Sequence, residues 1–313
     1  MIVKPLLMLN LSLILLIASL AANHRAYAKE FEVYYLGGQS NMDGYGTNED
    51  LPADLAADVD DVFIFHGNTS PDQVAVDGRG IWAPLQPGHG VGFKSDGRAN
   101  QYSNRFGVEL AFAQQLKKLR PGKNIALIKY SRGGTSIDAE AARQFGCWEP
   151  DFEQGEGEGK GVNQYDHFLA TLRYAMADID IDNDGVVDTL TPAGILWMQG
   201  ESDGALTAEI AARYENNLKR LMDLVRAGLR TDDLPVAIGR ISDSMHEDKK
   251  VWPHGDQVRQ AQRDFVEKDA AARLVISTDG YGYSDPWHYD SAGYLDLGRE
   301  FANSIHEIVP RED

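Results

Sequence analysis

The chain has 313 residues, of which 25% are charged and 43% are hydrophobic, and its formal net charge is -18 at pH 7. A surface with this much negative charge repels nucleic acid and anionic membranes, and we therefore expect neither as a partner. Neutral substrates and divalent cations are compatible with its charge. The chain has one cysteine, Cys147, which excludes an internal disulfide and leaves stabilisation to a large core. Because no cationic residue lies close to Cys147 in sequence, a catalytic thiol is not favoured.

The first residues have the pattern of an export signal. Lys4 precedes an apolar run over residues 6–22, and Ala26 and Ala28 are the small residues that a signal peptidase requires before its cut. We expect residues 1–28 to be removed as a signal peptide and the protein to be secreted or periplasmic, with an uncleaved membrane anchor as the alternative. Removing these residues, which include two basic and no acidic side chains, would change the net charge from -18 to -20.

Beyond the signal, residues 29–313 are predicted to form a single domain in which short β-rich runs alternate with segments of helical periodicity. This alternation is typical of a parallel sheet covered by helices. Strands are expected, in chain order, at residues 31–36, 62–65, 125–130, 194–198, 236–241 and 274–277. Apolar residues recur at helical spacing over 106–116, 165–176, 210–225 and 294–308, where they predict core-facing helices.

Two stretches interrupt the alternation, near residues 78–104 and 139–163. Both are rich in glycine and polar residues, and each contains one tryptophan, Trp82 and Trp148. In an α/β enzyme such insertions usually lie over the carboxyl ends of the strands. The sequence leaves two roles open for each tryptophan, stacking on a sugar or pinning its own loop.

A glycine-rich turn directly follows the first predicted strand. Gly37, Gly38 and Gln39 lead into Ser40 at the end of the sheet where ligands bind in parallel α/β folds. Glycines allow a sharp turn with outward-facing amides, so a serine there can attack a carbonyl beside hydrogen-bond donors. Taken alone, this turn is weak evidence, because such a turn more often contains an ordinary loop serine.

A second chemical element lies before the last predicted helix. A serine nucleophile needs a general base, and a histidine base needs an acceptor that fixes its tautomer. Asp285, three residues before His288 on a turn containing Pro286, is within reach of the imidazole. The alternative is a surface pair near a helix start, although Asp290 and Ser291 are better placed to cap that helix.

Two further glycine-polar segments, residues 131–136 and 197–203, follow the third and fourth main strands. Their expected use is an oxyanion hole formed by the backbone N–H groups of Ser40 and Gly133 and the side-chain amide of Gln199. Four such elements at four strand ends favour an acyl-transfer site. In it, Ser40 would form an acyl-enzyme, His288 would shuttle the proton, and no cofactor would be required.

Together these motifs resemble the sialate O-acetylesterase-like branch of the SGNH hydrolases, which includes acetylxylan esterases. The shared motifs, in order, are Gly38-Gln-Ser-Asn-Met42, Gly133-Gly-Thr135, Trp197-x-Gln-Gly-Glu-x-Asp203 and Asp285-x-x-His288. The resemblance extends over residues 31–308. It implies a flavodoxin-like three-layer α/β/α sandwich, Ser40 as nucleophile, His288 as base, Asp285 as its orienting partner, Gly133 and Gln199 as oxyanion donors, and removal of acetyl groups from carbohydrates.

Two motif residues have less defined roles. Glu201 is expected to order its own loop through backbone N–H groups. Arg132 stands where the family pattern has a small or apolar residue, and it would contact the substrate if it points into the site.

An acidic segment resembles the front half of a calcium-binding loop. Asp180, Asp182 and Asp184 alternate before Gly185, and Asp188 follows at the ninth position. The twelfth position is Thr191 rather than the glutamate of an EF-hand, so we expect an isolated structural calcium loop, with a solvated acidic turn as the alternative.

The sequence therefore predicts a secreted serine esterase that deacetylates an acetylated oligo- or polysaccharide. Two alternatives remain: an SGNH lipase or thioesterase acting on non-carbohydrate esters, and a non-catalytic, calcium-dependent carbohydrate-binding protein. Against the first, no long apolar cap is present; against the second, no member of the triad is missing.

Overall fold

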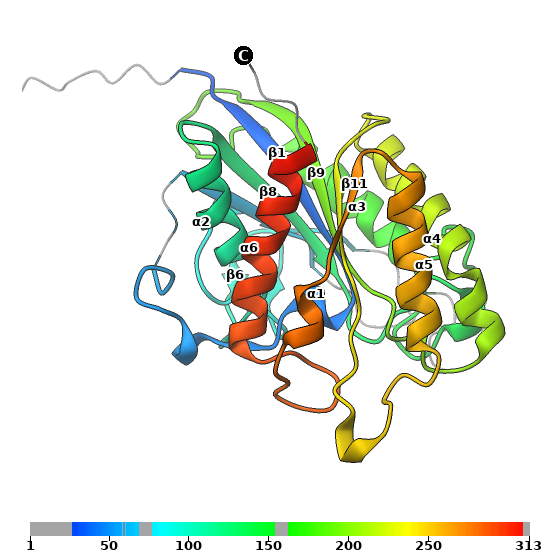
Figure 1. The fold of residues 1–313 in the computed structure, drawn as a ribbon. Helices are drawn as coiled ribbons and strands as arrows, with labels where there is room; N and C mark the ends of the chain where they lie inside the picture. The colour runs from blue at the N-terminus through cyan, green and yellow to red at the C-terminus, as the bar shows by residue number, and fades with distance from the viewer. Residues whose placement is uncertain (1–26, 58, 60, 69–76, 154–161, 309–313) are drawn as a thin grey trace, which may run out of the picture.

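A central sheet of seven strands runs through the part of the protein that the computed structural model describes, residues 27–57, 59, 61–68, 77–153 and 162–308 (Figure 1). The strand order is β11-β10-β9-β1-β8-β3-β4. The strands are β1 (Glu30–Gly38), β3 (Val62–His66), β4 (Trp82–Pro84), β8 (Asn124–Ser131), β9 (Thr189–Met198), β10 (Val236–Gly239) and β11 (Ala272–Val275). All neighbours pair in parallel except β4, which is antiparallel to β3.

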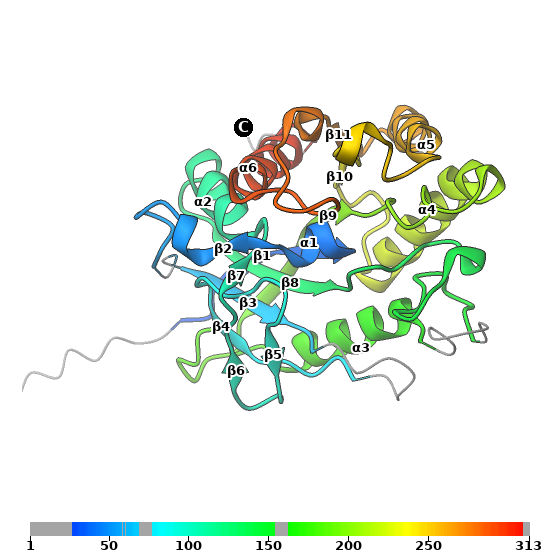
Figure 2. The same ribbon diagram turned by 90° about the horizontal axis from the view of Figure 1, so that it is seen from below.

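Helices cover both faces of this sheet, as its parallel strands require. They are α1 (Ser40–Asp43), α2 (Glu109–Leu119), α3 (Gln164–Ala177), α4 (Ala208–Gly228), α5 (Gly255–Lys268) and α6 (Ser291–Ile308). Figure 2 shows α2 and α6 together on one face and α3 on the opposite face, while α4 and α5 pack against each other near β10 and β11. The predicted three-layer α/β class is confirmed.

The remaining short elements lie in the loops. Two small antiparallel ribbons pair β2 (Gly46–Thr47) with β7 (Arg105–Phe106) and β5 (Lys94–Ser95) with β6 (Asn100–Gln101). Single 3-10 turns occur at Asn48–Asp50, Ala139–Ala141, His246–Asp248 and Ser277–Gly280.

The six predicted strands and four predicted helices are all present, whereas helices α1 and α5, strand β4 and the strands of the two small ribbons were not predicted. Helix α5 buries only Val258, Ala261 and Phe265 as large or medium apolar side chains, so its apolar stripe is weak. Strand β4 has three residues inside the 78–104 insertion, too few for a periodic signal.

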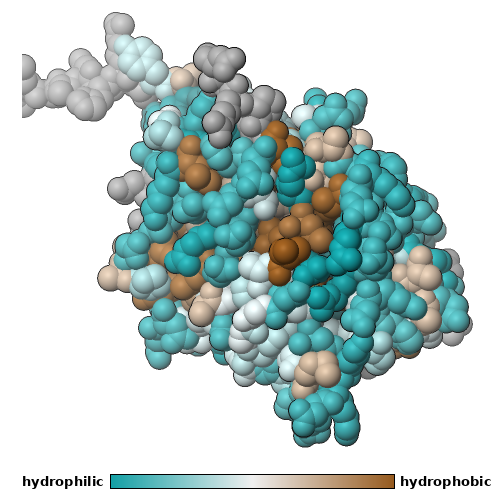
Figure 3. Space-filling view, in the orientation of Figure 1, coloured by the Kyte–Doolittle hydropathy of each residue, from teal (hydrophilic) through white to brown (hydrophobic). Residues whose placement is uncertain are grey.

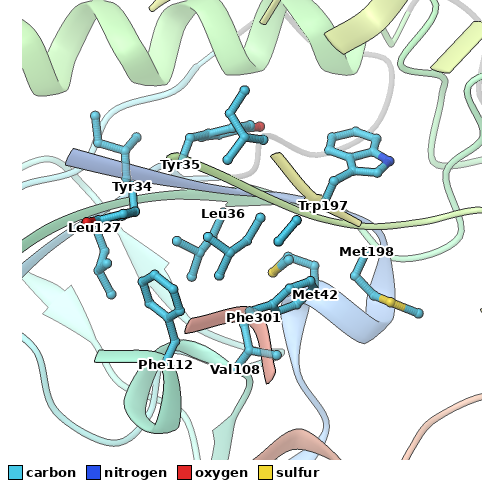
Figure 4. Packing of buried hydrophobic residues seen from close by; sticks show 14 of the residues in the cluster. Tyr34, Tyr35, Leu36, Met42, Val108, Phe112, Leu127, Trp197, Met198 and Phe301 are labelled. Carbon is cyan, nitrogen blue, oxygen red and sulfur yellow. The ribbon is translucent and has the colours of Figure 1, made fainter. Parts of the chain in front are cut away.

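The core consists of side chains that alternate between the two faces of the central strands. In Figure 4, Tyr35 and Trp197 point to one side of the sheet, and Leu36 and Phe301 lie on the other. All four are at most 1% exposed. The view in Figure 3 is mainly hydrophilic, with apolar residues confined to separate areas. Within the described residues, none of the helices is long and apolar enough to cross a membrane.

The two insertion tryptophans pin their own loops. The Trp82 indole N–H donates to the Ala175 carbonyl at 3.0 Å, and that of Trp148 donates to Thr135 Oγ1 at 2.9 Å. Trp82 is 9% exposed and Trp148 is fully buried, so neither presents a face to a sugar. Part of the second insertion, residues 154–161, and most of the expected signal, residues 1–26, lie outside the described residues.

Candidate active site

Three of the four predicted chemical segments follow adjacent strands whose ends are in register. Gly38, at the end of β1, pairs with Ser131 of β8 on one side and with Met198 of β9 on the other. The residues that come next, beginning with Gln39, Arg132 and Gln199, therefore meet at one edge of the sheet. Seen from this edge in Figure 2, α1 lies at the centre of the molecule.

Ser40 is the first residue of α1, and the turn before it requires glycine. Gly38 has φ of 141°, and a Cβ there would lie 2.0 Å from the Met198 carbonyl oxygen. The next residue, Gln39, donates its backbone N–H to that same oxygen at 2.9 Å. Because the chain is fixed so closely to β9, the Ser40 side chain is held at the mouth of the strand-end cavity, where it is 7% exposed.

His288 and Asp285 form the expected pair. His288 Nδ1 lies 2.7 Å from Asp285 Oδ2, and Asp285 Oδ1 accepts the backbone N–H groups of Trp287 and His288 at 2.8 and 2.9 Å. Burial acts to raise the pKa of Asp285, but the hydrogen bonds from His288 and from these amides outweigh it and lower the pKa. An ionised Asp285 holds the proton on Nδ1, which leaves Nε2 to act as the base.

The imidazole is also fixed by an aromatic neighbour. The Tyr45 ring stacks on the His288 ring with centroids 3.5 Å apart and planes 6° apart. His288 is 12% exposed at its side chain, so its ring cannot turn without displacing Tyr45.

Ser40 and His288 line the same cavity of about 570 Å³. Arg132 and Arg143 also line this cavity. The Arg132 guanidinium lies 4.9 Å from the centre of the Phe145 ring. Trp252 and Trp287 contribute aromatic surface, and Trp287 is 50% exposed. The sequence identified the motif that contains Trp287 but did not single out either tryptophan as a cavity residue.

Asn41 connects the nucleophile turn with the histidine loop. Its Nδ2 donates to the Trp287 carbonyl at 3.2 Å, and its Oδ1 accepts the Tyr289 backbone N–H at 3.3 Å and the Tyr294 hydroxyl at 2.8 Å. The residues on both sides of His288 are thus tied to the residue that follows Ser40. Sequence reasoning missed this role, although Asn41 lies inside the Ser40 motif.

Glu201 binds Asn41, a contact that the sequence did not predict. Its Oε1 accepts Asn41 Nδ2 at 2.7 Å, and Glu201 is 1% exposed. Its Oε2 is buried and has no hydrogen-bond partner among the described residues. Burial raises the pKa of Glu201, against the hydrogen bonds from Asn41 and from its own backbone N–H, which lower it.

Gln199 does not fulfil its predicted role as an oxyanion donor. Its Nε2 donates to Asp203 Oδ2 at 2.7 Å, to the Thr135 carbonyl at 3.1 Å and to Gln39 Oε1 at 3.2 Å. Gln199 is fully buried and is not among the residues that line the cavity. Its amide joins the three strand-end loops and has no N–H left for a substrate.

Gly133 lies beside Ser40 as predicted, with one unforeseen neighbour. A Cβ at position 133 would be 3.2 Å from Ser40 Cβ, and the Gly133 N–H donates to Asp43 Oδ2 at 2.9 Å. The Ser131 hydroxyl donates to Asp43 Oδ1 at 2.5 Å, and burial raises the pKa of Asp43. Asp43 lies three residues after Ser40 on one helical turn, a spacing that could have identified it.

A buried ion pair fixes the far end of α1. Lys129 Nζ donates to Glu109 Oε2 at 2.9 Å, to the Asp43 carbonyl at 2.9 Å and to the His89 carbonyl at 2.8 Å. Both charged side chains are fully buried. The pair is compensated by further hydrogen bonds, as a buried pair must be to persist.

The other candidate residues are placed away from this cavity. The free thiol of Cys147 is fully buried, and burial raises its pKa to about 12, which excludes a reactive thiolate. Ligand oxygens of Asp180, Asp182 and Asp188 lie within 4.8 Å of one another. Asp184, the fourth predicted ligand, accepts the Val186 backbone N–H at 2.9 Å, and the Lys29 ammonium pairs with Asp182.

Comparison with known proteins places this arrangement in a family. The model of the carbohydrate esterase family of sialic acid-specific acetylesterases matches residues 30–307. The chain belongs to this family. It is accordingly a carboxylic ester hydrolase that acts on acetyl groups of carbohydrates. Among curated proteins, no sequence matches the chain.

Solved structures share the fold of this esterase at low sequence identity. A protein from Arabidopsis thaliana superposes with a TM-score of 0.60 and 21% identity, covering 90% of this chain and 99% of its own. A carbohydrate acetylesterase from Xanthomonas citri gives a TM-score of 0.58 and 18% identity over 88% of this chain and 56% of its own. NanS superposes with a TM-score of 0.56 and 15% identity, covering 90% of this chain and 98% of its own.

Proposed function

We propose that this carbohydrate esterase is a secreted serine enzyme that removes O-acetyl groups through an acetyl-enzyme on Ser40, of the acetylxylan or sialate O-acetylesterase type. The observation that carries this proposal is the presence of Ser40 and the Asp285-supported His288 on the wall of one cavity. The structural neighbour from Xanthomonas citri, a carbohydrate acetylesterase, and the family of sialic acid-specific acetylesterases support an acetylated glycan as substrate.

In the proposed cycle, His288 Nε2 takes the Ser40 hydroxyl proton while Oγ attacks the acetyl carbonyl. The sugar hydroxyl then leaves with that proton. Water, deprotonated by the same nitrogen, releases acetate and restores Ser40. Asp285 stays ionised throughout and stabilises the imidazolium, which agrees with its lowered pKa.

For the oxyanion we propose the backbone N–H groups of Ser40 and Gly133, without Gln199. The Ser40 N–H is at the start of α1 and has no acceptor among the described residues. The Gly133 N–H would be shared between the oxyanion and Asp43. Burial raises the pKa of Asp43, and this direction supports the sharing, because it favours the form of the carboxyl that does not repel a developing negative charge.

Acetate release from a panel of acetylated xylan, pectin and sialic acids tests the proposal. Ser40→Ala is expected to lose activity by about 10⁴-fold or more, because the nucleophile is removed. Ser277→Ala is the matched control, since Ser277 contacts Tyr281 and does not line the cavity. Undiminished activity in Ser40→Ala would overturn the serine mechanism. Fast cleavage of long-chain esters with no release from any glycan would overturn the proposed substrates.

A further inference from the structure

The backbone of Lys29 is fixed on both sides at the point where β1 begins. Its nitrogen donates to Asp188 Oδ1 at 2.9 Å, and its carbonyl accepts the Thr189 backbone N–H at 2.8 Å. Asp188 is 4% exposed, and its second oxygen accepts the Ile181 N–H at 3.1 Å. A buried carboxylate therefore faces one particular backbone nitrogen of the chain.

The side chain of Lys29 lies against the same acidic loop. Its ammonium pairs with Asp182 and is 3.9 Å from Asp184 Oδ2. The hydrogen bond with Asp182 raises the pKa of Lys29. Among the described residues, no other lysine or arginine forms an ion pair with Asp180, Asp182, Asp184 or Asp188. The loop thus holds more negative charge than one lysine side chain neutralises.

The bond before Lys29 is the one that the export signal marks for cleavage. Ala26 and Ala28 provide the required small residues, and the neighbouring Tyr27 is 71% exposed. Hydrolysis of the Ala28–Lys29 peptide bond adds the oxygen of water to the Ala28 carbonyl, which leaves as a carboxylate. The Lys29 nitrogen becomes an ammonium at the position where its N–H now contacts Asp188.

We propose that Asp188 is the binding site for the amino terminus of the processed chain, and that signal removal locks β1 onto β9 by creating an ion pair between the Lys29 α-ammonium and Asp188. This inference rests on the proposed export of the enzyme. Cleavage converts a neutral N–H donor into an ammonium against a buried carboxylate, which adds an attraction between opposite charges to the existing hydrogen bond. The acidic loop is then compensated by two ammonium groups of one residue.

Urea unfolding of two chains tests the lock. One chain begins at Lys29, and the other begins at Ala28, so both have the same net charge but the second carries its ammonium one residue away. We expect the equilibrium constant for unfolding to be about fivefold lower in the Lys29 chain, because only there does the α-ammonium lie against the Asp188 carboxylate. In Asp188→Asn the two chains should be equally stable. Equal stability of the two unsubstituted chains would overturn the proposal, and that comparison needs no variant.

Calcium and the site of processing provide two further outcomes. If millimolar calcium stabilises the Lys29 chain and Asp188→Asn removes this effect, the metal is the cation of the loop and the proposal fails. Sequencing of the exported protein should give Lys29 as the first residue, and any other start also overturns it. Either failure leaves acetate release by Ser40 intact, so the two proposals are tested separately.

Discussion

The two ends of the β1–β9 strand pair both carry acidic side chains but hold them in opposite ways. At the carboxyl end, Glu201 and Asp203 are at most 1% exposed and accept hydrogen bonds from the uncharged amides of Asn41 and Gln199. At the amino end, aspartates of the 180–188 loop accept backbone N–H groups and pair with Lys29.

The acidic side chains at the carboxyl end fix the positions of their hydrogen-bond donors, whereas the exposed aspartates at the amino end remain in contact with water. A buried carboxyl without a cationic partner has a raised pKa, because burial disfavours its charged form. It holds its hydrogen-bond donor in one arrangement. An exposed member of the acidic loop such as Asp184 remains in contact with water and contributes little to stability. Substitutions at the carboxyl end should therefore lower activity strongly. Substitutions of exposed aspartates at the amino end should change stability only weakly.

The largest effect is expected at the base itself. His288→Ala should lower kcat for acetate release by about 10⁴-fold, because Ser40 then has no proton acceptor. Far-UV circular dichroism should be unchanged. His306→Ala, in the last turn of α6, is the matched control. A loss of less than tenfold in His288→Ala would show that another group serves as the base.

Glu201 tests whether the carboxyl end depends on position rather than charge. Glu201→Ala should lower kcat by about 10- to 100-fold with little change in KM, because Asn41 no longer holds the loops around His288 in place. Its free energy of unfolding should fall by about 1–3 kcal/mol, since Asn41 loses a buried acceptor.

Glu201→Gln keeps that acceptor and should restore most of both quantities. Steady-state kinetics and urea unfolding of the three proteins measure this. If Gln is as damaging as Ala, the charge of Glu201 rather than its hydrogen bond would be the important property.

Asp203 predicts a dependence of stability on pH. Burial raises its pKa to about 7, against the hydrogen bonds from Gln199 and from the Ile137 and Asp138 amides, which lower it. The neutral acid is thus favoured by folding. Its contribution is complete below the ordinary carboxyl pKa and is lost as the pH rises through about 7.

Urea unfolding at pH 5 and pH 8 measures this contribution. The wild type should lose more stability between these values than Asp203→Asn, which cannot ionise. The same loss in both proteins would assign the pH dependence to other groups.

The smallest effect is expected in the acidic loop. Asp184→Asn should change the free energy of unfolding by less than about 0.5 kcal/mol and leave kcat unchanged, because Asp184 is exposed and its ion pair with Lys29 is long. If Asp184→Asn lowered the free energy of unfolding by several kcal/mol without added metal, the proposed difference between the two ends of the β1–β9 pair would be wrong.

The sequence predicted the chemistry that depends on local spacing. Asp285 and His288 are three residues apart on one turn, and Ser40 follows a strand directly, so their placement needs little knowledge of the rest of the chain. The six main strands were predicted because each contains a short run of mainly apolar residues.

Roles that depend on contacts between distant segments were not predicted. Gln199 and Asn41 are both amides in glycine-rich motifs. Gln199 is enclosed among the loops, whereas Asn41 faces the His288 loop. This difference follows from the register of β1 with β9 and not from the motifs themselves. The contact between Glu201 and Asn41 was missed for the same reason, because the two residues are 160 positions apart.

The edges of the sheet bear on how the protein behaves at high concentration. Its longest strands, β1, β8 and β9, lie in the interior, whereas the two edge strands are β4 with three residues and β11 with four. Pro84 at the end of β4 has no N–H to donate. Such short edges offer another chain few backbone groups to pair with, so the fold resists edge-to-edge aggregation.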